Sequence, residues 1–255
     1  QQHRGKAIHT GKAMIEKKVA VVTGGGTGIG AACVRELAAK GFCVGIHYRS
    51  SVNAATVLLN EIGDGFLLQA NLADITQVEA LLEQIKGKTD RLDVLVNNAG
   101  VSIDIDMQRM RVEQFDAQRA VLRGVWLLTK RVLRLFMIRA NYGRIINISS
   151  VVGHTGNAGQ IPYTMEKAAM DALTKSLAWE LQGREILVNS VAPGFIATEM
   201  TARLPEEICS ELLRRVPLGR LGRPEEVAEV VGFLATAGSY ITGTVIHVNG
   251  GLYGG

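Results

Sequence analysis

Three side chains in the second half of the sequence have the types and spacing that carbonyl chemistry needs. Tyr163 and Lys167 are four residues apart, so on a helix they project from one face. A phenol beside an ammonium gives up its proton more readily, because the positive charge stabilises the phenolate. Ser150 stands thirteen residues before Tyr163, where its hydroxyl could hold a substrate oxygen against that phenol. We expect these three residues to be catalytic and to deliver a proton to a carbonyl oxygen.

A glycine-rich segment near the N-terminus supplies a place for a dinucleotide. It follows the apolar run Val19–Thr23 and opens a helical pattern that starts at Ile29. Glycines allow a tight turn and let backbone N–H groups approach a pyrophosphate at a helix N-terminus. Glycines that merely turn the chain are the alternative, since the spacing is looser than the general dinucleotide fingerprint. The expected contacts are Gly24, Thr27, Gly28, Ile29 and Gly30.

The end of the second expected strand selects between the nicotinamide cofactors. An NAD site usually places an acid there, which accepts hydrogen bonds from the ribose hydroxyls. Here the sequence continues through Arg49 and Ser50 with no acid. Arg49 can pair with a 2′-phosphate and Ser50 can donate to it, so NADP(H) is favoured. A solvated arginine at a strand end is the alternative.

The elements that position these groups alternate along the chain. Short runs rich in Val, Ile and Leu read as strands: Val19–Thr23, Cys43–Tyr48, Phe66–Ala70, Leu92–Asn97, Arg144–Ser149, Ile186–Ala192 and Thr244–Val248. Amphipathic segments between them read as helices: Ile29–Lys40, Val52–Ile62, Ile75–Ile85, Val112–Ile138, Pro162–Leu181 and Pro224–Ala235. Strands buried on both faces and separated by helices predict a parallel sheet. We expect an α/β fold: a single doubly wound (Rossmann) domain, with a seven-stranded parallel sheet and helices on both faces.

This domain is expected to span 19–255, after a flexible tail or remnant over 1–18. The region of about 194–223 interrupts the alternation with an extra helix, Glu206–Arg215, between two prolines. An insertion beyond a strand end is where a lid over a binding site is expected.

Composition excludes several classes of protein. Hydrophobic residues make up 47% of the chain and charged residues 20%, and the net charge is +4. This charge is too slight for a general nucleic-acid binder. No apolar run reaches the roughly 18 residues that a membrane span needs. Three scattered cysteines lack metal-ligand spacing, so we expect reduced thiols, no metal and a cytoplasmic location.

Five motifs in order resemble the short-chain dehydrogenase/reductase family. They are Thr23-Gly24-x-x-x-Gly28-x-Gly30, Asn97-Asn98-Ala99-Gly100, Ser150, Tyr163-x-x-x-Lys167 and Pro193-Gly194-x-Ile196-x-Thr198. Two further segments, 216–227 and 240–243, are similar to segments common in the 3-oxoacyl-[acyl-carrier-protein] reductases of that family. A lone Tyr-x-x-x-Lys is more often a boundary aromatic and a surface charge, but the four other motifs favour catalysis.

The resemblance implies a role for each motif residue. Tyr163 would be the general acid, Lys167 would assist it and bind the nicotinamide ribose, and Ser150 would stabilise the developing alkoxide. The spacing selects Ser150 over Ser149, which should face the opposite side of the strand. The further cofactor contacts that the resemblance implies are Asn71, Leu72, Asn98, Ala99, Gly100, Pro193, Gly194, Ile196 and Thr198.

One position departs from the family pattern. The family commonly carries an Asn in the long helix, where it anchors a water that relays protons to the Lys, and this chain has Val121 there. The valine could simply pack, since it shares an apolar face with Val125, Leu128, Val132 and Leu135. Because Ser150, Tyr163 and Lys167 are all present, retained activity is favoured over its loss. We expect Val121→Asn to raise turnover.

The long helix also has a basic side, formed by Arg119, Arg123, Lys130 and Arg134. One hypothesis is a docking surface for an acidic acyl carrier protein, with Arg184 as a second contact. A solvated face or a subunit contact is the alternative. The family pairs its long helices, here 112–138 and 162–181, across subunits, so the resemblance implies a homotetramer.

These observations lead to one principal function and two alternatives. The principal function is an NADPH-dependent carbonyl reductase that acts on a 3-oxoacyl thioester, carried by an acyl carrier protein or free as a small molecule. The first alternative is a dehydrogenase of another ketone or secondary alcohol. The second is a catalytically weak NADP-binding protein. The reason for this alternative is that Val121 stands where the family commonly has an Asn.

Overall fold

The computed structural model describes residues 17–198, 201 and 206–254. Of the tail expected over 1–18, residues 1–16 lie outside this described part of the chain. The strands are β1 (Val19–Val22), β2 (Cys43–Tyr48), β3 (Gly65–Gln69), β4 (Val94–Asn97), β5 (Tyr142–Ile148), β6 (Glu185–Pro193) and β7 (Val245–Val248). The helices are α1 (Gly28–Ala39), α2 (Val52–Ile62), α3 (Ile75–Lys88), α4 (Val112–Val132), α5 (Ile138–Ala140), α6 (Val152–Thr155), α7 (Ile161–Glu180), α8 (Glu206–Arg214) and α9 (Pro224–Thr236), with the π-helical turn η1 (Leu133–Met137) after α4.

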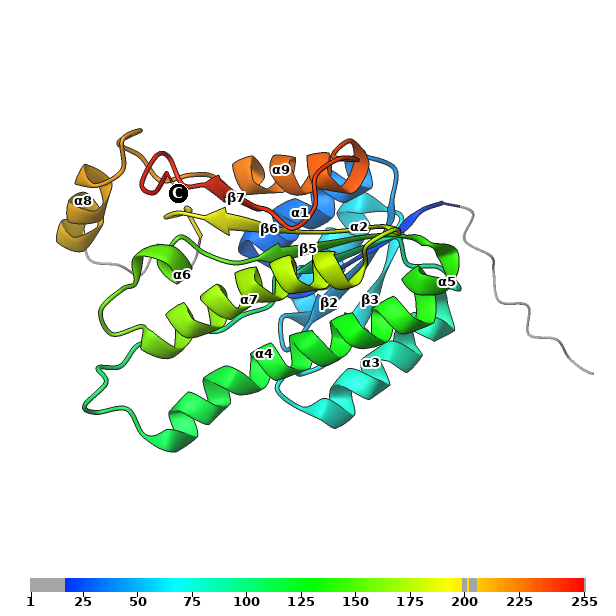
Figure 1. The fold of residues 1–255 in the computed structure, drawn as a ribbon, viewed down its shortest axis with the longest axis horizontal. Coiled ribbons are helices and arrows are strands. Elements are labelled where there is room, and N and C mark those ends of the chain that lie inside the picture. Colours follow the sequence, from blue (N-terminus) through cyan, green and yellow to red (C-terminus); the bar gives the residue numbers. More distant parts are fainter. Residues whose placement is uncertain (1–16, 199–200, 202–205, 255) are drawn as a thin grey trace, which may run out of the picture.

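Within the described residues the seven strands form one parallel sheet in the order β3-β2-β1-β4-β5-β6-β7. Helices α3, α4 and α7 cover one face of this sheet, and α1, α2 and α9 cover the other (Figure 1). The predicted doubly wound fold is therefore confirmed. The strand order reverses between β1 and β4, and such a switch point opens a crevice at the carboxyl ends of the strands.

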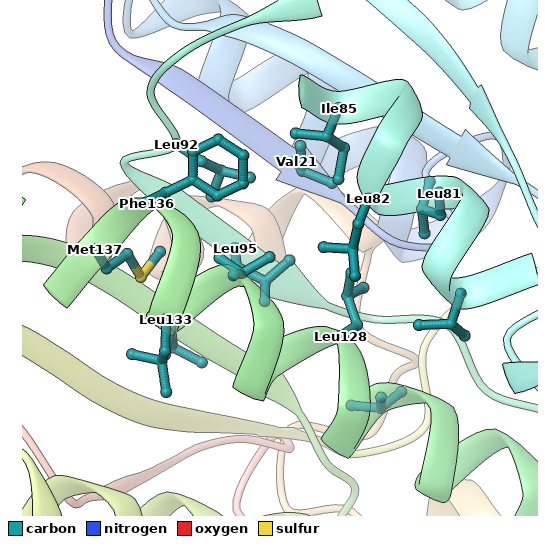
Figure 2. Packing of buried hydrophobic residues seen from close by; sticks show 14 of the residues in the cluster. Val21, Leu81, Leu82, Ile85, Leu92, Leu95, Leu128, Leu133, Phe136 and Met137 are labelled. Atoms are coloured by element: carbon teal, nitrogen blue, oxygen red, sulfur yellow. The ribbon is translucent and has the colours of Figure 1, made fainter. Parts of the chain in front are cut away.

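Two apolar layers hold the helices on the sheet. Successive residues of β1 point to opposite faces, so Val19 and Val21 join one layer while Ala20 and Val22 join the other. Figure 2 shows the first layer, in which Leu81, Leu82 and Ile85 of α3 pack near Leu128 of α4 and Leu95 of β4. Burial on both faces explains why the strands read as continuous apolar runs.

The long helix departs from the predicted apolar face at its C-terminal end. Val121, Val125, Leu128 and Val132 are buried as expected, but Leu135 is 42% exposed. The reason is η1, whose wider turn adds a residue and rotates the following side chains. Leu133, Phe136 and Met137 fill the core in its place.

The remaining differences from the predicted elements are small. Strand and helix ends shift by one to three residues, and α6 has no counterpart among the predicted helices. At four residues, α6 is too short to give a periodic pattern. Among the helices that the structure describes, none is both long and apolar enough to cross a membrane.

Candidate active site

A buried polar network fixes α4 and α7 against the sheet beneath the candidate site. The Asn97 amide donates to Thr129 Oγ1 of α4 at 3.0 Å and to Asn147 Oδ1 of β5 at 2.9 Å. Asn147 donates to Thr174 Oγ1 of α7 at 2.7 Å, and Thr174 contacts Ser190 Oγ of β6 at 2.8 Å. Hydrogen bonds between buried side chains restrict the positions of the elements that carry them, although Asn97 Oδ1 has no partner in the described part of the chain. This network therefore sets where the two helices lie over the strand ends.

The predicted Tyr163 and Lys167 lie one turn apart on α7. The Lys167 Nζ atom is 5.5 Å from the centre of the Tyr163 ring. Lys167 is only 4% exposed, and its ammonium donates to the backbone oxygen of Ile148 at 2.9 Å. Ile148 is the last residue of β5 and stands two positions before Ser150. The lysine thus links the face of α7 that carries Tyr163 to the strand end that precedes Ser150.

The two adjacent serines have different environments. Ser149 is buried, and its hydroxyl donates to the backbone oxygen of Val191 at 3.3 Å. Ser150 is partly exposed, and its Oγ accepts a hydrogen bond of 3.4 Å from the Val152 N–H. The hydroxyl of Ser149 is therefore committed to the sheet, whereas that of Ser150 lies at the start of α6.

The short helix α6 packs closely against α7. A Cβ on Gly153 would lie 2.9 Å from the backbone nitrogen of Ala168 and 3.0 Å from the carbonyl carbon of Lys167. Any side chain at this position would force the helices apart. The glycine thus lets the segment after Ser150 approach the turn that carries Lys167.

The glycine turn between β1 and α1 is held by the segment after β4. The Asn98 side chain donates to the backbone oxygens of Thr23 and Gly24 at 2.9 and 3.1 Å. Thr23 Oγ1 in turn accepts from the N–H groups of Asn98 and Ala99. A Cβ on Gly30 would lie 2.0 Å from the Gly24 oxygen. Glycine is therefore required for this turn to close on the first turn of α1.

The N-terminus of α1 has the features of an anion site. Thr27 is its N-cap residue, no side chain caps the helix, and its first turn contains no acid. Such an end presents backbone N–H groups and the positive end of the helix dipole. Gly28 has a φ of +53°, and a Cβ there would contact Thr198 at 3.5 Å. The residues fit a dinucleotide pyrophosphate, with Ile29 partly exposed beside them.

His47 supports the same turn and is not among the residues predicted from the sequence. It is 2% exposed, its Nδ1 accepts from the Gly24 N–H at 3.0 Å, and its Nε2 lies 3.1 Å from the Ala70 oxygen. Burial lowers the pKa of His47 to about 4. A neutral ring with the proton on Nε2 satisfies both contacts. A histidine in an otherwise apolar strand is the signal that could have revealed it.

The residues expected near the adenosine half lie beyond β2 and β3. Arg49 and Ser50 are exposed directly after β2, so both can reach a phosphate from the solvent side. Asn71 Oδ1 accepts from the Ala73 N–H at 3.1 Å. Leu72 is 4% exposed, and a Cβ on Gly124 of α4 would lie 1.8 Å from its backbone oxygen. The side chain of Leu72 belongs to the core, which leaves its backbone for any cofactor contact.

The segment after β6 continues along the crevice. The Pro193 oxygen accepts from the Val151 N–H at 2.8 Å, and the Gly194 N–H donates to the Val248 oxygen at 2.9 Å. Ile196 is 5% exposed and pairs with Gly222. A cavity of about 200 Å³ lies here, lined in part by Phe195, Val216, Leu218, Arg220 and His247. The lid predicted over 194–223 thus borders a cavity, although residues 199–200 and 202–205 lie outside the described part.

Two further buried polar residues near Lys167 were not predicted from the sequence. Glu166 is 4% exposed, and its Oε2 accepts from the Gln118 side chain of α4 at 2.6 Å. Gln118 is fully buried. Both positions follow the inward period of their helices, three residues after Tyr163 and three before Val121. Polar residues at core positions are the signal that could have been used.

Val121 packs in the apolar layer between α4 and the sheet. It is 7% exposed and belongs to the same cluster as Leu72 and Val125. The packing role considered for this valine is the one that the structure shows.

Comparison with known proteins decides the family. A family model described as "Enoyl-(Acyl carrier protein) reductase" matches residues 24–253. The chain is 46% identical to the 3-oxoacyl-[acyl-carrier-protein] reductase FabG of Haemophilus influenzae, over 94% of this chain and 99% of that protein. It is 46% identical to FabG of Aquifex aeolicus, over 94% and 98%, and 44% identical to FabG of Escherichia coli, over 93% and 98%. The chain belongs to the short-chain dehydrogenase/reductase family.

Membership confirms the predicted family and the predicted class of enzyme, an oxidoreductase. Short-chain dehydrogenases/reductases use a nicotinamide cofactor, and the uncapped α1 N-terminus and glycine turn described above fit that group. The match runs through α8, α9 and β7 as well as the glycine turn, so it covers the region that borders the cavity.

Proposed function

We propose that this protein is an NADPH-dependent reductase of 3-oxoacyl thioesters. The observation that carries the proposal is the arrangement of Tyr163, Lys167 and the end of β5, where Lys167 bonds to Ile148 beside Ser150. The names of three relatives at 44–46% identity support the thioester substrate. The absence of an acid directly after β2, together with the exposed Arg49 and Ser50, supports NADPH over NADH.

The mechanism assigns a separate task to each of three side chains. Ser150 donates a hydrogen bond to the substrate carbonyl oxygen and stabilises the negative charge that develops there. Tyr163 gives its phenolic proton to that oxygen as general acid. The Lys167 ammonium, held by the Ile148 oxygen, stabilises the phenolate that remains.

The cofactor would lie along the crevice from α1 to Thr198. When bound, its nicotinamide would supply the hydride that reduces the carbonyl carbon. The α1 N-terminus and the glycine turn would bind the pyrophosphate, and Arg49 with Ser50 would bind the 2′-phosphate. The remaining predicted contacts follow the crevice: Asn71, Leu72, Asn98, Ala99, Gly100, Pro193, Gly194 and Ile196.

The test is NADPH consumption with acetoacetyl thioesters as substrate. We expect turnover in the wild type and a loss of at least about 100-fold in Tyr163→Phe, which keeps the ring and removes the acid. Unchanged NADPH binding in that variant would show that the loss is chemical. Reduction of an enoyl thioester in place of the 3-oxoacyl compound would overturn the proposal, as would turnover only with other ketones or with none.

The basic side of α4 supports docking of an acidic acyl carrier protein. Its four predicted residues are all exposed: Arg119, Arg123, Lys130 and Arg134. Arg184 is exposed as well. Opposite charges steer encounter, and salt screens this steering. We expect KM for the carrier-linked substrate to rise with salt more steeply than KM for the free thioester, and equal slopes would exclude docking.

The exposed apolar side chains of α4 and α7 support a homotetramer. They include Val112, Met165 and Trp179, the last of which is 78% exposed. Large exposed apolar groups on neighbouring helices are typical of subunit contacts. Light scattering would test this assembly, and a monomer at micromolar concentration would contradict it.

The cytoplasmic location stays a prediction.

A further inference from the structure

Glu166 directly precedes Lys167 in the chain and carries a buried carboxyl group. The mechanism above does not use this group. Its side chain is 4% exposed. Burial raises the pKa of this carboxyl, while the charge of Lys167 and the hydrogen bond from Gln118 act in the opposite direction. Burying an ionisable group is costly unless it has a partner. The catalytic helix therefore contains a second proton-binding group within the fold.

Gln118 holds this carboxyl in place from α4. Its amide nitrogen donates to Glu166 Oε2 at 2.6 Å and to the Val101 oxygen at 2.6 Å. Its Oε1 accepts from the Ile103 N–H at 3.1 Å. Every polar atom of the Gln118 side chain thus has a partner, and together they join α4, α7 and the segment after β4.

The carboxyl and the ammonium face the same point beside Gly100. A Cβ on Gly100 would lie 3.3 Å from Lys167 Nζ and 3.9 Å from Glu166 Oε1. Gly100 is itself exposed. The two groups therefore lie on either side of a backbone position that solvent can reach, and a water there could bridge them.

The surroundings of Glu166 contain few charges. On α7 the charge that acts on it is the Lys167 ammonium. From α4 it is faced by the neutral Gln118 amide. Arg119, the next residue of α4, is exposed and lies over the Phe115 ring instead. In the described part of the chain, the pKa of Glu166 is thus set first by burial and next by the charge of Lys167.

We propose that Glu166, held by Gln118, is a positioning residue that returns protons to Lys167 during carbonyl reduction. This inference rests on the proposed function. Tyr163 gives its proton to the alkoxide, and the Lys167 ammonium gives one to the phenolate. A water beside Gly100 then carries the proton of the Glu166 carboxylic acid to the lysine amine, and the resulting carboxylate takes one from solvent. One proton enters for each carbonyl that is reduced.

The first test is the pH dependence of kcat in both reaction directions. Reduction needs Glu166 protonated and oxidation needs it ionised, so through its titration the reduction rate falls and the oxidation rate rises with increasing pH. Glu166→Gln keeps an acceptor for Gln118 but cannot titrate. We expect this variant to lose the inflection and to have a kcat about 10-fold lower, with KM nearly unchanged. This decrease is smaller than the 10²–10⁴-fold effect typical of a direct general acid.

Three further variants separate proton transfer from a merely structural role. Glu166→Asp keeps a carboxyl and should retain the inflection. Gln118→Leu removes a donor that favours the carboxylate, so the inflection should move to higher pH. Glu180→Gln removes the same charge from the exposed end of α7 and should behave as the wild type. A loss in Glu166→Gln that is equal at every pH would overturn the proposal.

The second test does not depend on turnover. In cofactor-free protein labelled with carbon-13 glutamate, the Glu166 carboxyl signal is identified by its loss in Glu166→Gln and titrated by NMR. We expect Lys167→Met and Gln118→Leu each to raise the pKa of Glu166 further, since both groups favour its ionised form. Coupling between two sites is reciprocal. An unchanged titration in Lys167→Met would refute the pairing, whereas absent turnover with intact coupling would count against the proposed function alone.

Discussion

The Nδ1 atom of His47 accepts a hydrogen bond of 3.0 Å from the backbone N–H of Gly24. The other ring nitrogen donates to Ala70 at the end of β3. One buried side chain on β2 thereby connects the glycine turn to the neighbouring strand. The contact from Gly24 requires an unprotonated Nδ1, so the charge of His47 and the geometry of the turn are linked.

The first prediction is that stability falls between pH 6.5 and pH 4. The pKa of His47 is about 4 in the folded protein, against 6.5 for an ordinary histidine. Below pH 6.5 the unfolded chain binds a proton that the folded protein does not, so the contribution is intact above pH 6.5 and is lost as the pH falls. The loss amounts to roughly 3 kcal/mol by pH 4. Urea denaturation across this range measures it.

His47→Gln removes the titrating group and is the matched variant. It should flatten the pH dependence of the unfolding free energy, although the variant starts from a lower stability. Cofactor affinity in the wild type should decline over the same pH range. Identical slopes in wild type and variant would show that other groups cause the acid sensitivity.

Gly30→Ala is expected to abolish cofactor binding. The added methyl would lie 2.0 Å from the Gly24 oxygen and 2.6 Å from the Asn98 amide nitrogen, and both must move. Overpacking of this kind typically costs about 1–3 kcal/mol. Gly87→Ala in α3 is the control, since a Cβ there meets nothing within 4 Å and should stabilise the helix by about 0.5–1 kcal/mol. Fluorescence titration with NADPH and thermal denaturation measure the two effects, and retained binding in Gly30→Ala would contradict the described turn.

Arg49→Glu is expected to reverse the cofactor preference. The acid would repel a 2′-phosphate and accept hydrogen bonds from a 2′-hydroxyl, so KM for NADPH should rise about 10-fold or more. KM for NADH should fall or stay constant. Lys88→Glu makes the same charge change at an exposed site near the end of α3 and should leave the preference unaltered. An equal effect of both substitutions would mean that Arg49 acts only through net charge.

Val121→Asn is expected to raise turnover at a cost in stability. The amide would supply the water anchor that the family pattern implies, but it would enter an apolar cluster at a position 7% exposed. An unpaired buried amide costs about 1–3 kcal/mol. Val121→Ala is the control, which should lose stability without gaining rate. A slower Val121→Asn enzyme with normal folding would show that Val121 is not a gap in the proton relay.

The layered fold could be predicted because its signals are local. Apolar runs such as Cys43–Tyr48 are buried on both faces, and this burial leaves a continuous pattern in the sequence. The end of α4 could not be predicted in the same way. The π-helical turn at Leu133–Met137 packs against β5, where a Cβ on Gly143 would lie 2.5 Å from the Met137 sulfur. A strict period of 3.6 residues does not predict the extra residue of this turn.

The sequence by itself was sufficient to predict the motifs whose residues lie close together in the chain. Tyr163 and Lys167 share a helix face through their spacing alone, and the glycines before α1 carry their own conformational requirement, as the φ of +62° at Gly24 shows. Both features depend on residues that are close in the chain. They can therefore be derived without knowledge of the fold.

Only the tertiary structure decided which distant residues support these motifs. His47 reaches Gly24 across 23 positions, and Gln118 reaches Glu166 across 48. The sequence pattern can show that each of these side chains faces inward, but it does not show which residue each one contacts, because each pairing depends on how strands and helices pack. Their charge states follow from burial, which is a property of the folded chain and not of the residue type.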